Sequence, residues 1–291
     1  MQTTSFGRSR GCSPDPVQTS GDPLVADSIT QLGPEARGVV VVCASHGGRF
    51  AAAYAADLGV RAVVFNDAGV GKDRAGVAGL DLLAERGLPA VAVLGSSARI
   101  GDGADTLARG VVGHVNAPAG SLGCRVGAAV GEALARLSTA QPLAGGAIED
   151  GDVAEARELL LEGPPQVWAL DSASLVRPSD AGAILLTGSH ANLLGGKPGT
   201  ALKADAFLAV YNDAGSDPTT GCTRLPVLDA RGIAAAAVAS TSARIGDGRS
   251  TYDEGVLTAL NGRARELGGR VGMTARELVE MALSSHGTVV A

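Results

Sequence analysis

The chain contains an internal duplication, and this feature constrains its fold more than any other. Four motifs occur twice, in the same order and at nearly constant spacing: Asp-Ser at 27 and 171, Ser-His at 45 and 189, Asn-Asp-Ala-Gly at 66 and 212, and Ser-Ala-Arg-Ile-Gly-Asp-Gly at 97 and 242. Such a long repeat indicates that one supersecondary arrangement is built twice. We therefore expect two similar halves that are related by a pseudo-two-fold axis.

Each copy alternates short apolar runs with alanine-rich segments. The apolar runs cover 39–43, 61–65 and 88–94 in the first copy and 184–186, 207–211 and 233–239 in the second. Runs of this length are typical of strands that are buried on both faces. The segments between them, such as 50–58 and 80–86, favour helices, and this alternation predicts parallel sheets. The predicted fold class is α/β, with two three-layer halves that are Rossmann-like or flavodoxin-like.

The repeat also sets the expected domain boundaries. These are a flexible N-terminal arm over 1–22, a first α/β repeat over 23–138, a linker with a helix over 139–166, a second α/β repeat over 167–283 and a C-terminal tail over 284–291. The arm lacks the apolar segment of a signal peptide. Within the linker, 153–161 has helical spacing. Ser285-His286 echoes the repeated pairs but falls in the expected tail.

Composition argues against several classes of partner. The net charge is −6 and the basic residues are not clustered, so nucleic acid is not expected. No apolar run reaches the length of a membrane span. The four cysteines are far apart and form no Cys-x-x-Cys pair, which fits a reducing, cytoplasmic location rather than a disulfide framework. Glycine-rich α/β enzymes with few aromatic residues are often dimers or larger assemblies, so a homo-oligomer is one expectation.

The repeated motifs follow the expected strands, at the edge where parallel α/β sheets bind ligands. His46 and His190 are candidate general bases, since a neutral imidazole can accept a proton near pH 7. Asp67 and Asp213 could orient these rings or act as bases themselves. Ser45 completes the first pair as a further catalytic candidate. The competing interpretation is structural, with the serines as helix caps and the Asn-Asp-Ala-Gly segments as tight turns.

The third repeated motif carries an arginine in each copy. Arg99 and Arg244 could clamp a small anion such as a carboxylate, because a guanidinium binds such groups through two hydrogen bonds. The alternative is a salt bridge to the aspartate three residues later, Asp102 or Asp247, which also looks like a helix N-cap. Both interpretations remain open in the sequence.

Further candidates come from the loops beside these motifs. Lys72 follows the first Asn-Asp turn and could act as a nucleophile or stabilise a carbanion. With Gly47, Gly48 and Arg49 it favours the first copy as the half that performs the chemistry. The other predicted substrate-binding residues are Ser97, Ser242, Asn66, Asn212 and Ser189. No Gly-x-Gly-x-x-Gly follows a first strand, so we expect no dinucleotide and no other cofactor.

The sequence therefore predicts a cofactor-independent hydrolase or lyase, for an amide or ring-opening reaction, that acts on a small anionic carbonyl compound between the repeats. Three alternatives remain open. A metal-dependent hydrolase would use His46, Asp67 and Asp102, or the equivalent residues of the second copy, although we predict no metal ligands. A non-catalytic small-acid binding protein would need the arginines but not the histidines.

The third alternative is a racemase. The segment Gly221–Pro226 resembles the second cysteine motif of the two-half amino-acid racemases of the aspartate/glutamate type, which implies a thiol from each half. Cys222 would supply one thiol and Cys43, at the end of an expected strand, the other. The repeat does not relate these two cysteines, because the counterpart of Cys43 is Thr187.

Overall fold

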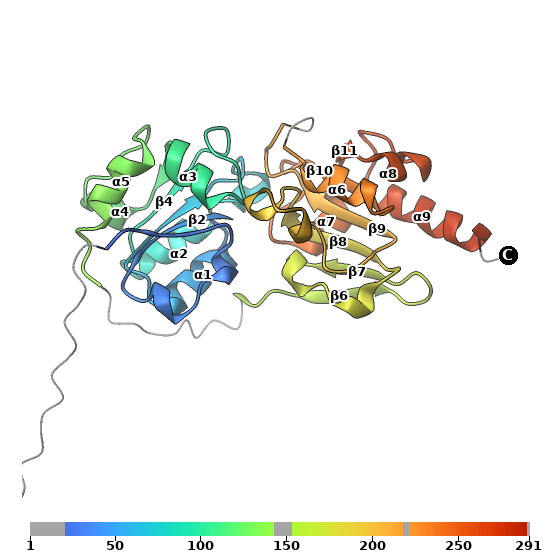
Figure 1. Cartoon of the computed structure of the whole chain (residues 1–291), viewed down its shortest axis with the longest axis horizontal. Coiled ribbons are helices and arrows are strands. Elements are labelled where there is room, and N and C mark those ends of the chain that lie inside the picture. The colour runs from blue at the N-terminus through green and yellow to red at the C-terminus, as the bar shows by residue number, and fades with distance from the viewer. Residues whose placement is uncertain (1–20, 143–152, 218–220, 290–291) are drawn as a thin grey trace, which may run out of the picture.

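The computed structural model describes residues 21–142, 153–217 and 221–289. Each half of the chain forms one sheet dominated by parallel strands, with five strands in the order β1-β2-β3-β4-β5 and six in the order β11-β10-β9-β8-β7-β6. Figure 1 shows the two halves side by side, the first in blue to green and the second in yellow to red. The predicted α/β class is confirmed.

The first half is a three-layer sandwich. Its strands are β1 (Leu24–Ala26), β2 (Val40–His46), β3 (Ala62–Asn66), β4 (Ala90–Val93) and β5 (Val112–Val115), of which only β5 is antiparallel to its neighbour. The crossover helices α1 (Arg49–Leu58) and α2 (Gly79–Glu85) cover one face, and α3 (Gly103–Arg109), α4 (Ala117–Ser121) and α5 (Val130–Leu137) cover the other.

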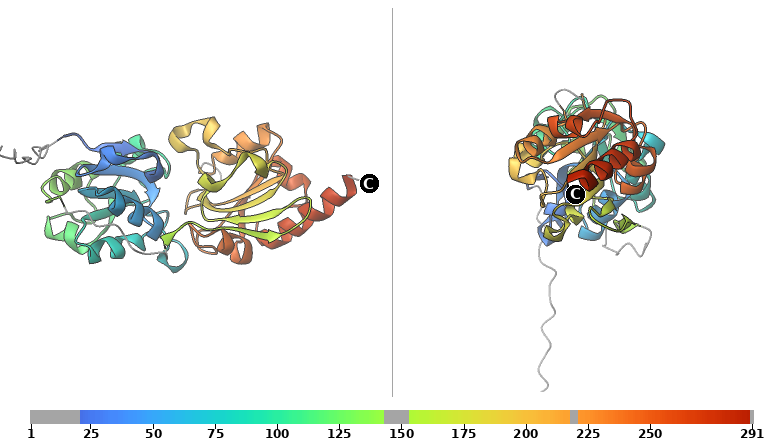
Figure 2. Two further views of the ribbon diagram at one scale, coloured as in Figure 1. Left: turned by 90° about the horizontal axis from the view of Figure 1, so that it is seen from below. Right: turned by 90° about the vertical axis from the view of Figure 1, so that its right-hand side faces the viewer.

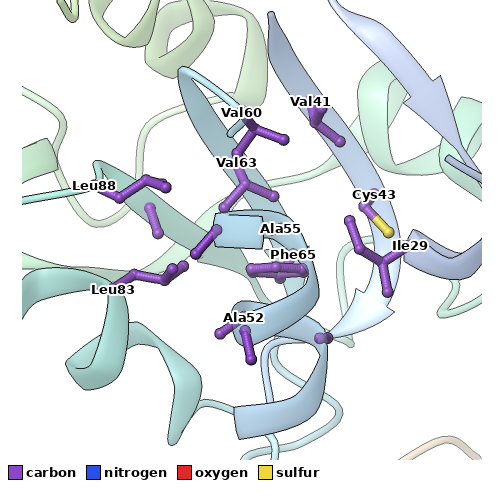
Figure 3. Close-up of a cluster of buried hydrophobic side chains, with 14 of the residues drawn as sticks. Ile29, Val41, Cys43, Ala52, Ala55, Val60, Val63, Phe65, Leu83 and Leu88 are labelled. Carbon is purple, nitrogen blue, oxygen red and sulfur yellow. The ribbon is translucent and has the colours of Figure 1, made fainter. Parts of the chain in front are cut away.

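Alanine and valine fill the core of this half, as its low aromatic content requires. On the α1 side, Val41, Val63 and Phe65 point from the sheet toward the helices, where Ala52, Ala55 and Leu83 meet them (Figure 3). Successive strand residues point to opposite faces, so Val42 and Val64 enter the second core on the α5 side. Small side chains on α1 allow this helix to lie close to the sheet.

The second half repeats this plan around its own sheet. Its strands are β6 (Arg157–Leu161), β7 (Val167–Leu170), β8 (Ile184–His190), β9 (Leu208–Asn212), β10 (Ala234–Val238) and β11 (Leu257–Leu260). Its α-helices are α6 (Arg224–Ala230), α7 (Gly248–Glu254), α8 (Gly262–Glu266) and α9 (Ala275–Val289). Figure 2 shows α9 at the end of this half that lies away from the first half. No described helix has the length and apolar character needed to cross a membrane.

Strand order follows chain order within both described sheets. Flavodoxin-like and Rossmann folds reverse their strand order and bind ligands at the point of reversal. This protein has no such point in its described strands. Instead, the carboxyl ends of β2 and β8 meet the opposite half: the ring of His46 lies beside Gly246, and that of His190 beside Gly101. A pseudo-two-fold axis would produce reciprocal contacts of this kind, and the axis itself stays a prediction.

Two predictions about the segments outside the repeats are wrong. The helix expected over 153–161 is absent, because Arg157–Leu161 is strand β6, which adds an antiparallel edge to β7. Arg157 fixes this strand by pairing with Asp180 at 2.7 Å and lying 4.0 Å from the ring centroid of Trp168. The tail expected from residue 284 instead continues α9, where the ring of His286 stacks on Phe207. The N-terminal arm lies outside the described residues, except for 21 and 22.

The two copies differ most in the connection after their Ser-His strands. In the first copy this connection is α1, whereas in the second it consists of the 3-10 turns η7 (Leu194–Gly196) and η8 (Pro198–Thr200). Arg224 at the start of α6 takes the place of Gly79 at the start of α2, since their N–H groups donate to the equivalent carbonyls of Ala191 and Gly47. A side chain on Gly79 would collide with α1, and without that helix Arg224 has room.

The halves touch through their Asn-Asp turns. Gly69 and Gly215 both have positive φ, and a Cβ on Gly69 would lie 2.9 Å from the Cα of Gly215. Around this contact a small apolar cluster joins the halves, composed of Ala68, Ile100, Ala214 and Ile245. The Lys72 N–H also donates to the Ser240 carbonyl at 2.8 Å. Backbone thus meets backbone at the centre of the molecule.

Candidate functional site

A cavity of about 340 Å³, which we call the main cavity, lies between the two halves. Both repeated pairs, Ser45-His46 from the end of β2 and Ser189-His190 from the end of β8, form part of its wall. The other polar side chains around it are Ser28, Thr30, Glu155, Asp171, Ser172, Ser174, Thr200, Lys203 and Arg224. The structure therefore brings the two Ser-His pairs together, as the duplicated sequence led us to expect.

The hydrogen bonds of the two imidazoles define where their protons lie. His46 Nδ1 accepts from the Gly48 N–H at 3.1 Å, and His190 Nδ1 accepts from the Asn192 N–H at 3.2 Å. A ring nitrogen that accepts carries no proton, so the proton of each neutral ring lies on Nε2. Among the described residues, both rings make their hydrogen bonds through Nδ1 and none through Nε2, and both rings line the cavity. Each ring therefore offers an N–H donor to a ligand.

Burial keeps both rings neutral. It lowers the pKa of His46 to about 4. It also lowers the pKa of His190 well below its usual value, and the nearby Arg224 and His46 add to this effect. Because Nε2 already carries the proton and Nδ1 is occupied, the arrangement favours a donor role over the predicted general-base role.

The serines hold local structure beside these rings. Ser45 Oγ accepts from the Ile29 N–H at 3.0 Å, and Ser189 Oγ accepts from the Ala173 N–H at 2.8 Å. They thereby tie the 3-10 turns η1 (Ile29–Gln31) and η5 (Ala173–Leu175) to the strand ends. No hydrogen bond joins either described serine to the histidine that follows it, as expected for neighbours on a strand. Ser45 is therefore not activated as a nucleophile by His46.

Asp67 and Asp213 stabilise turns rather than orient the histidines. Asp67 Oδ1 accepts from the N–H groups of Gly69 at 2.9 Å and Gly95 at 2.8 Å. Asp213 Oδ1 makes the equivalent bonds with Gly215 and Ser240, both at 2.9 Å. Their remaining oxygens face His114 and Thr258 respectively. The turn interpretation of this motif accounts for these contacts.

Asn66 and Asn212 lie beneath these turns. The amide of Asn66 donates to the Ala98 carbonyl and that of Asn212 to the Ala243 carbonyl, both at 3.0 Å. The hydroxyls of Ser97 and Ser242 donate to carbonyls three residues earlier and accept from the N–H groups of Val111 and Val256. Gly47 and Gly48 lie where β2 approaches α2, and the Gly48 N–H donates a hydrogen bond to the His46 ring. These residues shape the strand ends and do not line the main cavity.

The arginines of the repeated motif form ion pairs. Arg99 is exposed and pairs with Asp102 at 3.0 Å and Asp105 at 3.5 Å. Arg244 pairs with Asp247 in its own half and reaches Asp73 of the other half, both at 3.0 Å. Neither guanidinium lines the main cavity, so the structure does not bring them together as an anion clamp.

Other ionic contacts and caps follow the structural interpretation. Asp102 and Asp247 are N-caps of α3 and α7, accepting from the Asp105 and Ser250 N–H groups. The predicted nucleophile Lys72 forms an ion pair across the halves with Glu254, at 2.8 Å. Lys72 also lies outside the main cavity.

Arg224 is a site residue that the sequence reasoning missed. Only 4% of its surface is exposed. Its Nε donates to the Asn192 carbonyl at 3.0 Å, and its Nη1 donates to the carbonyls of Thr200, at 2.6 Å, and Ala201. No ion pair neutralises it among the described residues, although it lines the cavity. Alignment of the copies places it opposite Gly79, but the sequence does not reveal that α1 has no counterpart.

The sequence analysis also missed three other residues of the cavity wall, Glu155, Asp171 and Lys203. Asp171 accepts from the N–H groups of Gly248 at 3.0 Å and Ala156 at 2.7 Å, and burial raises its pKa. Lys203 Nζ donates to the Ser174 carbonyl at 2.6 Å. The repeated Asp-Ser motif could have identified Asp171 as a candidate site residue. Glu155 lies outside the repeat and had no such signal.

A second cavity of about 290 Å³ adjoins the first. The two cavities share His46, Phe50, Glu155 and Asp171 as wall residues. Arg49, Asp73, Arg244 and Asp247 contribute charged groups to the second one only. One imidazole and two carboxyl groups thus stand between the two spaces.

Two alternatives find little support in this geometry. Cys43 and Cys222 are buried, which raises their pKa values to about 11 and about 12, and neither thiol lines the main cavity. Within the described residues, no three side chains of His, Cys, Asp or Glu come close enough together to hold a metal ion. His46, Asp67 and Asp102 therefore do not form the metal site that was considered.

Fold and site together define a two-half α/β protein with a polar cavity between its halves. No protein-family model, no curated protein and no solved structure matches the chain.

Proposed function

We propose that this protein is a hydrolase or lyase that binds a small anionic carbonyl compound in the main cavity and breaks a bond next to its carbonyl group. The observation that carries the proposal is the convergence of three groups on one cavity. These are the two neutral imidazoles, which enter from opposite halves, and the buried guanidinium of Arg224.

The environment of Arg224 favours binding of an anionic ligand. A buried charge is costly unless an opposite charge or hydrogen bonds compensate it. Three backbone carbonyls provide hydrogen bonds to Arg224, and no described carboxylate neutralises its charge. A bound carboxylate would supply that charge and would accept charge-assisted hydrogen bonds. Arg224 thus replaces Arg99 and Arg244 as the proposed anion-binding residue.

The histidines support chemistry at a carbonyl group. Neutral imidazoles with a free Nε2–H polarise a carbonyl oxygen and stabilise the negative charge that develops on it in the transition state. Since His46 and His190 enter from opposite halves, they approach a ligand between them from two sides. This role needs donors that stay neutral, which agrees with the lowered pKa of both rings.

The proposal is tested with a panel of short carboxylates and cyclic amides, screened for binding by NMR and for turnover. The variants His46→Asn and His190→Asn keep an acceptor for the local N–H but lose the Nε2 donor. We expect each to reduce kcat about 100-fold, the usual effect of removing one such donor. Arg224→Gln should weaken binding about tenfold or more, whereas the exposed Arg99→Gln serves as the matched control.

Unchanged turnover in both histidine variants would remove the proposed role of the imidazoles. Binding at Arg224 without turnover of any bound compound would instead favour the alternative of a small-acid binding protein.

A further inference from the structure

The linker contributes a carboxyl group to the cavity. Val153, just before β6, packs against the core of the first half. Ala156 is held to Asp171 in the second half by two hydrogen bonds, from the Ala156 N–H to Asp171 Oδ2 at 2.7 Å and from the Asp171 N–H to the Ala156 carbonyl at 3.0 Å. Glu155 lies between these two anchors and lines both cavities. The segment 153–156 therefore fixes Glu155 at the junction of the two spaces.

Glu155 differs from the other carboxylates around it. Asp171 and Asp247 accept backbone N–H groups, and Asp73 and Asp247 pair with Arg244. Glu155 instead accepts hydrogen bonds from side-chain hydroxyls, those of Ser172 and of Ser174, the latter long at 3.4 Å, and it forms no ion pair within the described residues. Burial, with a smaller contribution from the nearby Asp171, raises the pKa of Glu155. Its carboxyl group is therefore the one most ready to exchange a proton with a ligand.

The charged groups that share these two cavities with Glu155 come from both halves. The carboxylates are Asp73, Asp171 and Asp247, and the cations are Arg49, Lys203, Arg224 and Arg244. The two imidazoles are His46 and His190. Most of the cations are already paired or hydrogen-bonded, as described above, and both imidazoles are neutral.

We infer that Glu155 is the acid–base residue of the cavity, which takes up a proton when a small carboxylate binds at Arg224 and exchanges that proton during bond cleavage. The inference rests on the proposed function, because it requires the anion site. A second negative charge in one cavity disfavours the ionised form of Glu155, so an anionic ligand and a proton bind together.

Glu155 can supply and accept the protons that hydrolysis transfers. Water adds to the carbonyl carbon, forming a C–O bond, and the bond from that carbon to the leaving atom breaks with its electron pair. The leaving atom takes the proton of the Glu155 carboxyl group. The resulting carboxylate then accepts the proton that the added water loses, so Glu155 ends the cycle protonated.

The test uses isothermal titration calorimetry of the full chain with succinate, in buffers of different ionisation enthalpy. We expect proton uptake on binding, and an affinity that falls with rising pH by up to about tenfold per pH unit where one full proton is taken up. In Glu155→Gln, which mimics the protonated form, uptake should disappear while affinity is kept or increases. The matched control is Glu158→Gln, an exposed residue of β6 that pairs with Arg249, and it should keep the uptake.

The outcomes separate the two proposals. If succinate fails to bind, or binds equally well to Arg224→Gln, the anion site and with it the proposed function are overturned. If succinate binds at Arg224 but proton uptake is absent, or persists in Glu155→Gln, only the inference about Glu155 is overturned. A second measurement needs no ligand: ¹³C NMR titration of the Glu155 carboxyl carbon should give a midpoint above the ordinary 4.5, and an ordinary midpoint would contradict the inference.

Discussion

At the scale of single residues, the site depends on which ring nitrogen carries a proton. The sequence placed two histidines at equivalent strand ends, and the structure shows that both use Nδ1 to accept a neighbouring N–H. A chain pattern can reveal that a histidine is repeated, but the tautomer depends on the local turn that follows it. The residue was therefore predictable and its role was not.

The lowered pKa of His46 predicts a pH-dependent stability. Between pH 6.5 and about 4 the unfolded chain takes up a proton at this residue, whereas the folded chain does not. The free energy of unfolding should therefore fall as the pH drops through this range, by roughly 2 to 3 kcal/mol for this residue. Urea unfolding of the wild type and of His46→Asn at several pH values measures the effect.

The effect of His46 is the difference between the pH curves of the wild type and of His46→Asn. The wild-type curve alone does not give it, because Glu155 and Asp171 have raised pKa values and therefore stabilise the folded chain as the pH falls. Parallel pH curves for the wild type and His46→Asn would show that His46 titrates normally in the folded state.

The turn role of Asp67 predicts a stability defect rather than a catalytic one. Asp67→Ala removes the acceptor of two N–H groups, those of Gly69 and Gly95, and should lower the free energy of unfolding by about 3 kcal/mol. Asp67→Asn keeps an acceptor oxygen and should lose clearly less. Thermal unfolding of the two variants makes the comparison, and an equal loss in both would argue for a role of the charge itself.

At the scale of elements, Arg224 has room in the cavity wall because the second half has no counterpart of α1. The alanine-rich pattern of 50–58 correctly predicted α1, and three strands of each copy were predicted with shifts at their ends, whereas β1, β5, β7 and β11 were not predicted. The sequence has no comparable signal for a missing helix, because the glycine- and proline-rich segment after His190 is compatible with several turns. For the same reason β6 was mistaken for a helix: its pairing with β7 is a contact that spacing alone does not reveal.

The loop that replaces the helix should depend on Arg224. Its guanidinium is hydrogen-bonded to the carbonyls of Asn192, Thr200 and Ala201, and so joins both ends of the loop. Arg224→Met fills a similar volume without these bonds, so amide hydrogen exchange over 193–203 should become at least about tenfold faster. The equivalent region of the first half, 49–58, serves as the internal control. Unchanged exchange in the loop would show that Arg224 does not hold it.

At the scale of the whole molecule, the duplication predicted the architecture well. Two similar sheets, their helices and the meeting of both Ser-His pairs at one cavity follow from it. It did not predict that the two arginines of the third motif would lie outside the wall of that cavity, because a repeat fixes equivalence within each half and not the way in which the halves dock. Arg244 reaches Asp73 across the interface, whereas Arg99 stays with the acids of its own half.

The glycine contact between the halves gives a prediction about docking. Gly69 and Gly38 have nearly the same φ, +68° and +69°, but only Gly69 faces the other half, while a Cβ on Gly38 would meet nothing within 4 Å. Gly38→Ala should therefore show the conformational cost alone, about 1 kcal/mol. Gly69→Ala should lose at least about 2 kcal/mol more, because its methyl group would push against Gly215. Calorimetric unfolding compares them, and equal losses would contradict the close contact.

The absence of a counterpart to α1 also determines how a molecule can lie between the halves. Two identical walls would bind an unsymmetrical ligand in two opposite orientations with equal binding free energy, and half of the binding events would be unproductive. Arg224 and its loop belong to one wall only. The lack of this helix in one copy therefore gives a ligand one preferred orientation, which two identical copies would not impose.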